Sequence, residues 1–220
     1  MADRSLARRL AHESIEQGDA LGWFESLYQH AAGDESTVPW ADLVANPNLD
    51  SWLERSGTKG DGKQALVVGC GLGDDAERLA SLGFQVTAFD ISQTAIDWCV
   101  RRFPNSAVDY RVADLFSPPQ DWISRFDFVF EAYTLQVLPA EMRADAARRI
   151  ADLVAADGIL LIVARGREPH EDPGQMPWPL LRDEFAVLGA CDLTEVNFED
   201  YVDDEDPPVR RFRAEYHRPQ

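Results

Sequence analysis

The sequence predicts a doubly wound α/β fold, in which helices cover both faces of a parallel sheet. Apolar strand-like runs alternate with segments of helical spacing between residues 64 and 164, and the first run meets a glycine-rich turn. The length of 220 residues suits one such domain with a short appendage, but not two large domains. We therefore expect one domain with a ligand crevice beyond the carboxyl ends of its strands.

Two strand-helix units open this domain. Residues 65–68 form an apolar run, residues 69–73 a glycine-rich turn, and the next segment has helical spacing. Residues 86–89 are β-branched or aromatic and predict a second strand. Ser92 is then a suitable N-cap for a helix that ends near Phe103.

The second half of the chain continues the alternation and adds a hairpin. Because helices separate the strands, right-handed crossovers are expected to make the sheet parallel up to its fifth strand. The last two strands flank an acidic run, residues 199–206, which is expected to be a solvated hairpin tip. The predicted strands are 108–112, 126–130, 158–164, 191–198 and 209–217, and the predicted helix is 140–155.

The first 60 residues differ in composition from the rest. They hold Trp23, Phe24, Trp40 and Trp52 among short helical patterns and turn residues. We predict that residues 1–60 form a helical N-terminal cap or lid and that residues 61–220 form the α/β domain.

Composition and charge exclude several classes of protein. Lys and Arg number 21 against 39 Asp and Glu, so the net charge of −18 opposes a nucleic-acid partner. No signal-peptide core or membrane span is evident, so no membrane partner is expected and a cytoplasmic location is predicted. Three cysteines without a Cys-x-x-Cys pair and four scattered histidines predict neither a disulfide framework nor a metal site.

The glycine-rich turn holds Gly69, Gly71 and Gly73, whose missing side chains let backbone approach a ligand. A dinucleotide-binding fingerprint would place its third glycine one residue later, at Asp74. The carboxylates of Asp74 and Asp75 would also repel a pyrophosphate. The turn therefore argues against a nicotinamide-dependent oxidoreductase. The alternative is that it is a simple tight turn that binds no ligand.

Acidic residues follow the next two strands, where a nucleoside would lie. Asp90 ends the second strand, so its carboxylate is a candidate to accept from both hydroxyls of a ribose. Asp114 follows the third strand and is a candidate acceptor for an adenine amino group, with Ile91 and Leu115 on either side of the ring. Asp90 could equally be a solvated turn residue or cap the next helix.

Together, the Gly-x-Gly-x-Gly turn, the strand-ending Asp90 and residues 113–116, Ala-Asp-Leu-Phe, resemble a class I S-adenosylmethionine-dependent methyltransferase. Residues 138–143, Leu-Pro-Ala-Glu-Met-Arg, are similar to a motif of the thiopurine S-methyltransferase and halide/thiocyanate methyltransferase group. An aromatic segment before Pro39-Trp40 matches the N-terminal signature of that group. The spacer before Pro39 is longer than in the group, and a Gly-Pro-Pro segment is only loosely matched, which leaves the substrate open.

The resemblance implies a Rossmann-like sheet of order 3-2-1-4-5-7-6. It also implies S-adenosyl-L-methionine as the cofactor and S-adenosyl-L-homocysteine as the product. A sulfonium is compatible with a carboxylate-rich loop, as a phosphate would not be. Besides the residues above, the resemblance places Trp23, Trp40 and Glu131 at the cofactor, although Trp23 and Trp40 could also be core aromatics.

Two residues are weak catalytic candidates. Tyr133 follows the fourth strand, where it would face the transferred methyl group, although a buried, hydrogen-bonded tyrosine is nearly as plausible. His170 lies in a long loop after the fifth strand and could act as a base, although a solvated loop histidine is commoner. Methyl transfer is an in-line displacement, so no nucleophile-base pair is required.

These observations predict methyl transfer from S-adenosylmethionine to a small-molecule acceptor. The resemblance points to a thiol or other soft nucleophile, and the net charge favours an uncharged or heterocyclic thiol over a free anion. A thiol also supplies some thiolate at neutral pH without a strong base. Oxygen acceptors remain open, and the rivals are the oxidoreductase and a protein that binds S-adenosylmethionine without turnover.

Overall fold

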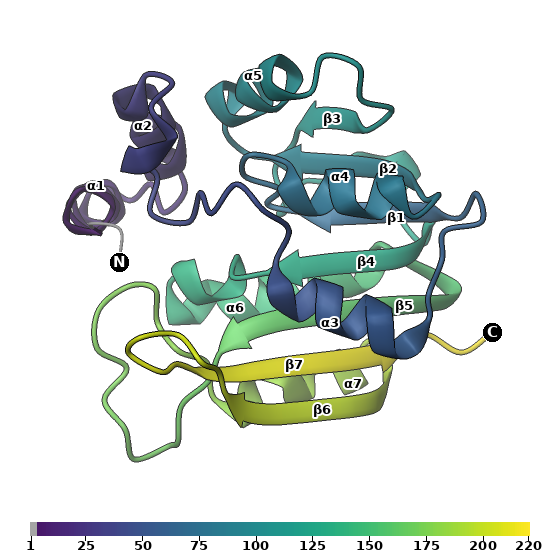
Figure 1. Cartoon of the computed structure of the whole chain (residues 1–220). Coiled ribbons are helices and arrows are strands. Elements are labelled where there is room, and N and C mark those ends of the chain that lie inside the picture. The colour runs from purple at the N-terminus through teal and green to yellow at the C-terminus, as the bar shows by residue number, and fades with distance from the viewer. Residues whose placement is uncertain (1–3) are drawn as a thin grey trace.

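The structure, a computed structural model, describes residues 4–220 and contains a seven-stranded sheet of order β3-β2-β1-β4-β5-β7-β6 (Figure 1). The first five strands pair in parallel, and β7 runs antiparallel to both β5 and β6. The predicted fold class and strand order are therefore confirmed. The strands are β1 (Gln64–Val68), β2 (Gln85–Asp90), β3 (Asp109–Val112), β4 (Phe126–Ala132), β5 (Val154–Arg165), β6 (Thr194–Val202) and β7 (Arg210–His217).

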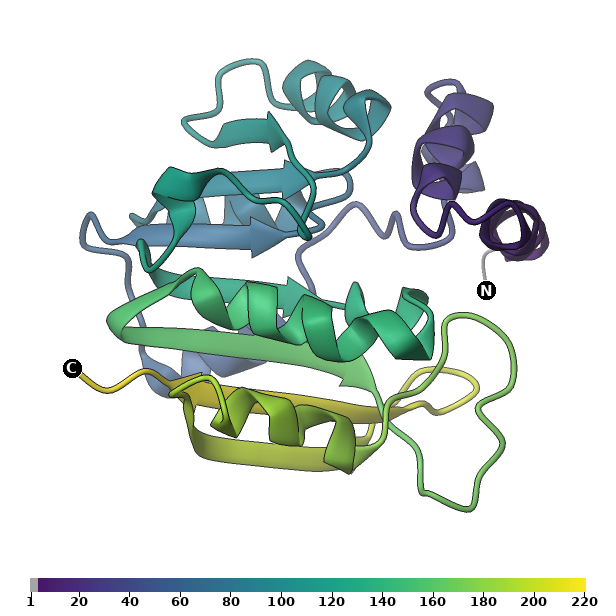
Figure 2. The same cartoon turned by 180° about the vertical axis from the view of Figure 1, so that it is seen from behind.

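Helices cover both faces of the sheet. The face in front in Figure 1 carries α3 (Pro47–Ser56) and α4 (Asp74–Ser81), and the opposite face, seen in Figure 2, carries α6 (Ala140–Asp152) and α7 (Ala186–Gly189). Two apolar cores result, one on each face. Residues 65–68 of β1 are buried because both of their faces are covered, which explains a continuous apolar run instead of an alternating one.

Most predicted boundaries hold within a few residues. Ser92 does cap α5 (Gln93–Arg102), since its side chain accepts from Ala95 N at 3.0 Å. Helix α6 ends at Asp152 instead of residue 155, because β5 already begins at Val154. Four short 3-10 helices are also described, η1 (Glu35–Thr37), η2 (Gln120–Trp122), η3 (Leu135–Val137) and η4 (Arg182–Phe185).

The acidic run is only partly a hairpin tip, which corrects the prediction. Glu199 and Asp200 lie within β6 and pair across the ladder with Arg213 and Arg210. Opposite charges on neighbouring strands stabilise such a ladder, so this part of the run is structural. Only the segment after Val202 forms the turn.

The N-terminal helices α1 (Ser5–Glu16) and α2 (Gly22–Ala31) lie beyond the carboxyl ends of the parallel strands (Figure 1). They share a small apolar cluster in which Trp23 and Leu27 pack against Met176 of the long loop after β5. Residues 1–3 of the predicted cap lie outside the described residues, and the division at residue 60 stays a prediction. No described helix has the length and apolar character needed to cross a membrane.

Helix α2 is attached to the start of α5 by one carboxylate. Glu25 accepts from the Ser92 hydroxyl at 2.6 Å, and from the Thr94 hydroxyl at 2.6 Å and the Thr94 backbone N–H at 3.1 Å. Burial alone would raise the pKa of Glu25, but these hydrogen bonds outweigh it and lower the pKa below its ordinary value of 4.5. The ionised carboxylate is therefore the form that holds α2 in place.

Replacing Glu25 by glutamine should lower the free energy of unfolding by about 1–2 kcal/mol at pH 7, because charge-assisted hydrogen bonds are lost. A lowered pKa in the folded state means that this stabilisation is complete above pH 4.5 and is lost as pH falls through the folded-state value. Urea unfolding of both proteins at several pH values measures the difference. Glu54→Gln, at an exposed helical site, is the control, and an equal loss in both variants would contradict the anchoring role.

Candidate functional site

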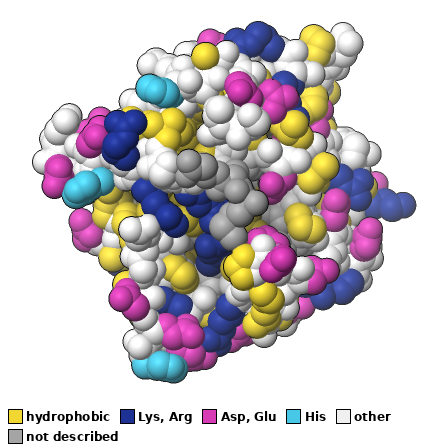
Figure 3. Space-filling view, turned by 60° about the vertical axis from the view of Figure 1, so that its left-hand side comes forward, with side chains coloured by type: hydrophobic (Ala, Val, Ile, Leu, Met, Phe, Trp, Pro, Cys, Tyr) yellow, Lys and Arg dark blue, Asp and Glu magenta, His cyan; other side chains and the backbone are white. Residues whose placement is uncertain are grey.

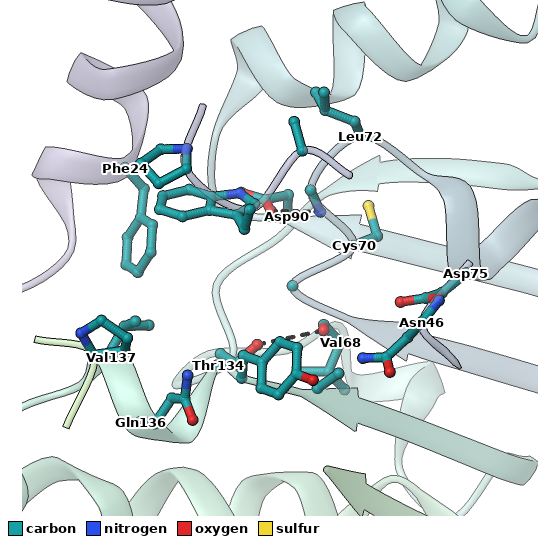
Figure 4. Close-up of a pocket in the computed structure, with 18 of the residues that line it drawn as sticks. Phe24, Asn46, Val68, Cys70, Leu72, Asp75, Asp90, Thr134, Gln136 and Val137 are labelled. Carbon is teal, nitrogen blue, oxygen red and sulfur yellow. Dashed lines mark hydrogen bonds between the residues drawn. The ribbon is translucent and has the colours of Figure 1, made fainter. Parts of the chain in front are cut away.

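A cavity of about 620 Å³ opens at the carboxyl ends of the parallel strands, where the sequence predicted the ligand crevice. Its walls come from the loops after β1, β2, β3, β4 and β5, from the N-terminal helices and from the β6–β7 turn. Figure 4 shows side chains from α2, from the glycine-rich turn and from the segments at the ends of β2 and β4 around one space. The volume is typical of a small-molecule site.

The glycine-rich turn forms one wall of the cavity and is closely packed. Gly69 and Gly71 line the cavity and have φ values of 60° and 54°, a region that strongly favours glycine. A Cβ on Gly69 would lie 2.5 Å from Thr134 Oγ1, and one on Gly71 would lie 3.3 Å from Tyr28 Oη. The turn therefore needs glycine both for its backbone and for the side chains above it.

Asp90 lies at the end of β2 and lines the same cavity, although the residue is buried and only 6% exposed. One carboxylate oxygen accepts from Gly71 N at 3.1 Å and the other from Ser92 N at 2.9 Å. Burial raises the pKa of Asp90 to about 6, while the backbone hydrogen bonds oppose that rise. Each oxygen retains a lone pair that a ligand hydroxyl can use.

The residues expected around an adenine are brought together at the neighbouring strand ends. Ile91, Asp114 and Leu115 all line the cavity. Asp114 Oδ1 accepts from Phe116 N at 2.9 Å, which fixes the carboxylate and leaves its other oxygen available. The three residues predicted to surround an adenine therefore line one cavity.

Aromatic side chains of the N-terminal segment cover the glycine-rich turn. Tyr28 and Trp40 line the cavity, and Trp40 Nε1 donates to Tyr28 Oη at 2.8 Å. Trp23, in contrast, does not line it: the indole is 1% exposed and stacks on Phe24 at 3.9 Å between ring centroids. Phe24 lines the cavity in its place, because adjacent helical residues point to different sides.

Two further residues expected at the cofactor do not line the cavity. Gly73 has a φ of 90°, and a Cβ added to it would lie 2.6 Å from Tyr110 Oη. This glycine therefore serves the turn into α4 and the packing of Tyr110. Glu131 is fully buried, and its Oε1 accepts from Thr134 N at 2.6 Å and Leu135 N at 3.1 Å. Burial raises its pKa to about 7. Its observed contacts organise the loop after β4.

The two aspartates after the glycine-rich turn both line the cavity. Asp74 forms a pair of hydrogen bonds with Arg102, at 2.8 and 2.9 Å, so its charge is neutralised. Asp75 accepts from Asn46 N at 2.6 Å, and burial raises its pKa to about 7. Carboxylate groups border this end of the cavity, and no unpaired cation among residues 4–220 lies beside them.

The two weak catalytic candidates lie in different environments. Tyr133 lines the cavity with a φ of 67°, and Asn48 Nδ2 donates to its hydroxyl at 3.3 Å. Burial raises the pKa of Tyr133, so the phenol stays protonated at neutral pH and can donate a hydrogen bond but is a poor base. His170 is exposed in the loop after β5 and does not line the cavity.

Several lining residues were not predicted from the sequence. Gln136 is 3% exposed and reaches the cavity from η3, and Arg165 reaches it from the end of β5. Arg4 and Arg211 come from the two ends of the chain. No local motif marks the three arginines, because only the fold brings their segments together.

Comparisons with known proteins agree with this geometry. Residues 65–158 match a family model described as a methyltransferase domain. A protein of Arabidopsis thaliana named probable thiol methyltransferase 2 is 27% identical over 161 residues, which are 70% of this chain and 66% of that relative. The chain thus spans slightly less than two thirds of the relative's length.

Two solved structures share the fold. The 1,6-didemethyltoxoflavin-N1-methyltransferase of Burkholderia thailandensis, solved with S-adenosylhomocysteine, matches with a TM-score of 0.69 at 18% identity, covering 96% of this chain and 91% of that one. The N-methyltransferase NodS of Bradyrhizobium japonicum matches with a TM-score of 0.68 at 21% identity, covering 90% and 98%. The chain therefore shares the fold of these methyltransferases, and residues 65–158 match the methyltransferase-domain family model.

Proposed function

We propose that this protein transfers the methyl group of S-adenosylmethionine to a small-molecule thiol. The proposal depends mainly on one observation: residues at the ends of three neighbouring strands line the same cavity. They are Gly69 and Gly71 after β1, Asp90 at the end of β2 and Leu115 after β3. The cavity continues past these residues to the ends of β4 and β5, which leaves room for an acceptor beside the cofactor. The thiol is supported by the name of the Arabidopsis relative.

The cofactor site is assigned from the contacts of the described residues. Asp90 would accept from both ribose hydroxyls with the lone pairs that its backbone partners leave free. Ile91 and Leu115 would lie on the faces of the adenine, with Asp114 at its amino group. Trp40 and Tyr28 would cover the cofactor over Gly71. Trp23 and Gly73 would support the site indirectly through packing, and Glu131 would do so through its hydrogen bonds to the loop after β4.

The bound cofactor supplies an electrophilic methyl group, so the chain itself must position the acceptor and exclude water. The aromatic side chains and the apolar walls serve the second task. Tyr133 would orient the acceptor with its protonated hydroxyl. A thiol fits a site of this kind because part of it is already ionised near neutral pH, whereas an aliphatic alcohol would need a strong base.

The rival functions fit the site less well. A nicotinamide dinucleotide would place its pyrophosphate at the glycine-rich turn, where Asp75 lies without a paired cation among the described residues. A protein that only binds S-adenosylmethionine would have no use for the second half of the cavity. Turnover separates this second rival from the proposal, as the acceptor screen below measures.

Asp90→Asn should weaken S-adenosylmethionine binding by about 10- to 100-fold, because neutral acceptors form weaker hydrogen bonds than a carboxylate. Since the hydroxyls favour the ionised form and the pKa of Asp90 is about 6, wild-type affinity should rise as pH increases from 5 to 7. Isothermal titration at several pH values should detect this dependence, which the variant should lose. Asp97→Asn, on the exposed side of α5, is the control. Equal affinities for the wild type and the folded Asp90 variant would remove Asp90 from the site.

A panel of thiols, halides, phenols and carboxylates, assayed for release of S-adenosylhomocysteine, tests the acceptor. We expect turnover with thiols at least tenfold faster than with phenols of the same shape, because thiols ionise more readily and are softer nucleophiles. Turnover confined to oxygen acceptors would reject the thiol assignment while retaining methyl transfer. Cofactor binding without turnover of any class would favour the non-catalytic rival.

Residues 1–45 are proposed to act as a lid that cofactor binding stabilises, since Phe24, Tyr28 and Trp40 contact the cavity from this segment. Saturating S-adenosylhomocysteine should therefore slow proteolysis within this segment several-fold. Cleavage products are identified by mass spectrometry, and cleavage in the segment 57–63, which does not line the cavity, provides an internal reference. Equal rates with and without ligand would show that the segment is not a lid.

A further inference from the structure

Three arginines gather at the end of the cavity farthest from the adenine residues. Arg165 ends β5, Arg211 lies in β7, and Arg4 directly precedes α1, and all three line the cavity. Figure 3 shows Lys and Arg side chains gathered around a hollow in one face of this strongly acidic protein. Such a local reversal of charge needs an explanation.

Among the described residues, only Arg211 of the three arginines is paired with acidic side chains of the protein. Arg211 is 5% exposed and donates to Asp203 at 2.6 Å and to Glu205, and its guanidinium lies 5.2 Å from the ring centroid of Tyr133. Within residues 4–220, the guanidinium groups of Arg4 and Arg165 have no hydrogen bond or ion pair. These two cations are therefore available to a ligand.

The surroundings of Arg4 and Arg165 favour an added anion. Burial lowers the pKa of both groups, and the repulsion of Arg165 by Arg4 and Arg211 lowers it further. Asp42 and Glu205 act in the opposite direction, but both are exposed, and Glu205 already accepts from Arg211. Water screens such exposed charges, so they compensate the cluster weakly.

Gln136 adds an oriented donor beside Arg165. Its Oε1 accepts from the backbone N–H of Arg165 at 2.7 Å, which determines the orientation of the amide. The amide nitrogen is then directed into the cavity, as Figure 4 shows, although the residue is only 3% exposed. None of the hydrogen bonds found among residues 4–220 uses this nitrogen, so a ligand oxygen is its natural partner.

We propose that Arg4, Arg165 and Gln136 bind a carboxylate of the methyl acceptor. This inference rests on the proposed methyl transfer and narrows its substrate class. Phe24, Val137 and Met176 line the cavity near these polar groups, so the remainder of the acceptor is apolar. The acceptor is therefore an apolar or aromatic thiol that carries a carboxylate.

The position of the subsite relative to the strands separates it from the cofactor. Asp90 and Gly69 mark the ends of β2 and β1, whereas Arg165 ends β5, two strands beyond β1. Neighbouring strands lie about 4.8 Å apart, so the end of β5 is roughly 10 Å from the end of β1 and roughly 14 Å from the end of β2. A thiol bound through Arg165 can therefore reach toward the strand end where a methyl group would be presented.

The test compares 4-mercaptobenzoate with 4-methylbenzenethiol, which differ only in the carboxylate and the methyl group that replaces it. In Arg165→Gln, the ratio of kcat/KM for the acid to that for the neutral thiol should fall about 10- to 100-fold from its wild-type value. Comparing ratios removes the different intrinsic reactivities of the two thiols. Arg165→Lys should lose less, because it retains the charge but not the planar fork. Arg148→Gln, at an exposed position on α6, should keep the wild-type ratio.

A binding measurement makes the test independent of turnover. Isothermal titration of the S-adenosylhomocysteine complex should show that 4-(methylthio)benzoate binds at least tenfold more tightly than 4-(methylthio)toluene, and that Arg165→Gln removes this preference. Thermal unfolding checks that the variant is folded. No preference in the wild-type protein, or an unchanged ratio in the variant, would overturn the carboxylate subsite.

Two further outcomes would show which part of the argument is wrong. Weaker S-adenosylhomocysteine binding in Arg165→Gln, with an unchanged ratio, would assign the arginines to the cofactor and overturn the inference. Failure of the wild-type protein to bind the cofactor would reject the proposed function itself. In that case, titration of 4-(methylthio)benzoate into the protein alone still decides whether the arginines bind a carboxylate.

Discussion

The carboxylate of Asp90 joins three parts of the structure at one point. Its two oxygens accept from Gly71 of the glycine-rich turn and from Ser92, the N-cap of α5. Ser92 in turn donates to Glu25, which holds α2 over the cavity. The turn, the strand end and the N-terminal segment thus depend on one short chain of hydrogen bonds. A ligand hydroxyl bound to Asp90 would act on all three.

This chain of hydrogen bonds also explains why the cavity is built as it is. Burial destabilises the ionised form of Asp90 and raises its pKa to about 6, and the backbone N–H donors around it offset this only in part. The protein tolerates such a cost where a ligand can use the carboxylate. Glu25, in contrast, is stabilised as a carboxylate by hydrogen bonds, and its role is to position α2.

Local charge and net charge give different answers about the acceptor. A net charge of −18 argues against long-range attraction of anions and therefore favours an uncharged thiol. The cavity, however, places Arg4 and Arg165 together at one end and acidic residues at the other. Once a ligand is bound, contacts within a few ångströms outweigh the screened field of distant surface carboxylates. The arginines therefore determine the orientation of a bound acceptor, whose carboxylate would lie at their end of the cavity.

The strand pattern and the glycine-rich turn are enough to predict the sheet and half of the site. Apolar runs such as residues 65–68 are long enough and regular enough to define strands, and the glycines and Asp90 are neighbours of strand ends, so their convergence follows from the topology. That Phe24 instead of Trp23 faces the cavity depends on how α2 packs in the folded protein, because a rotation of about 100° per helical residue separates the two. The tertiary structure also decided that Arg4 and Arg165, 161 positions apart, share one wall, since contacts between distant segments leave no trace in local sequence patterns.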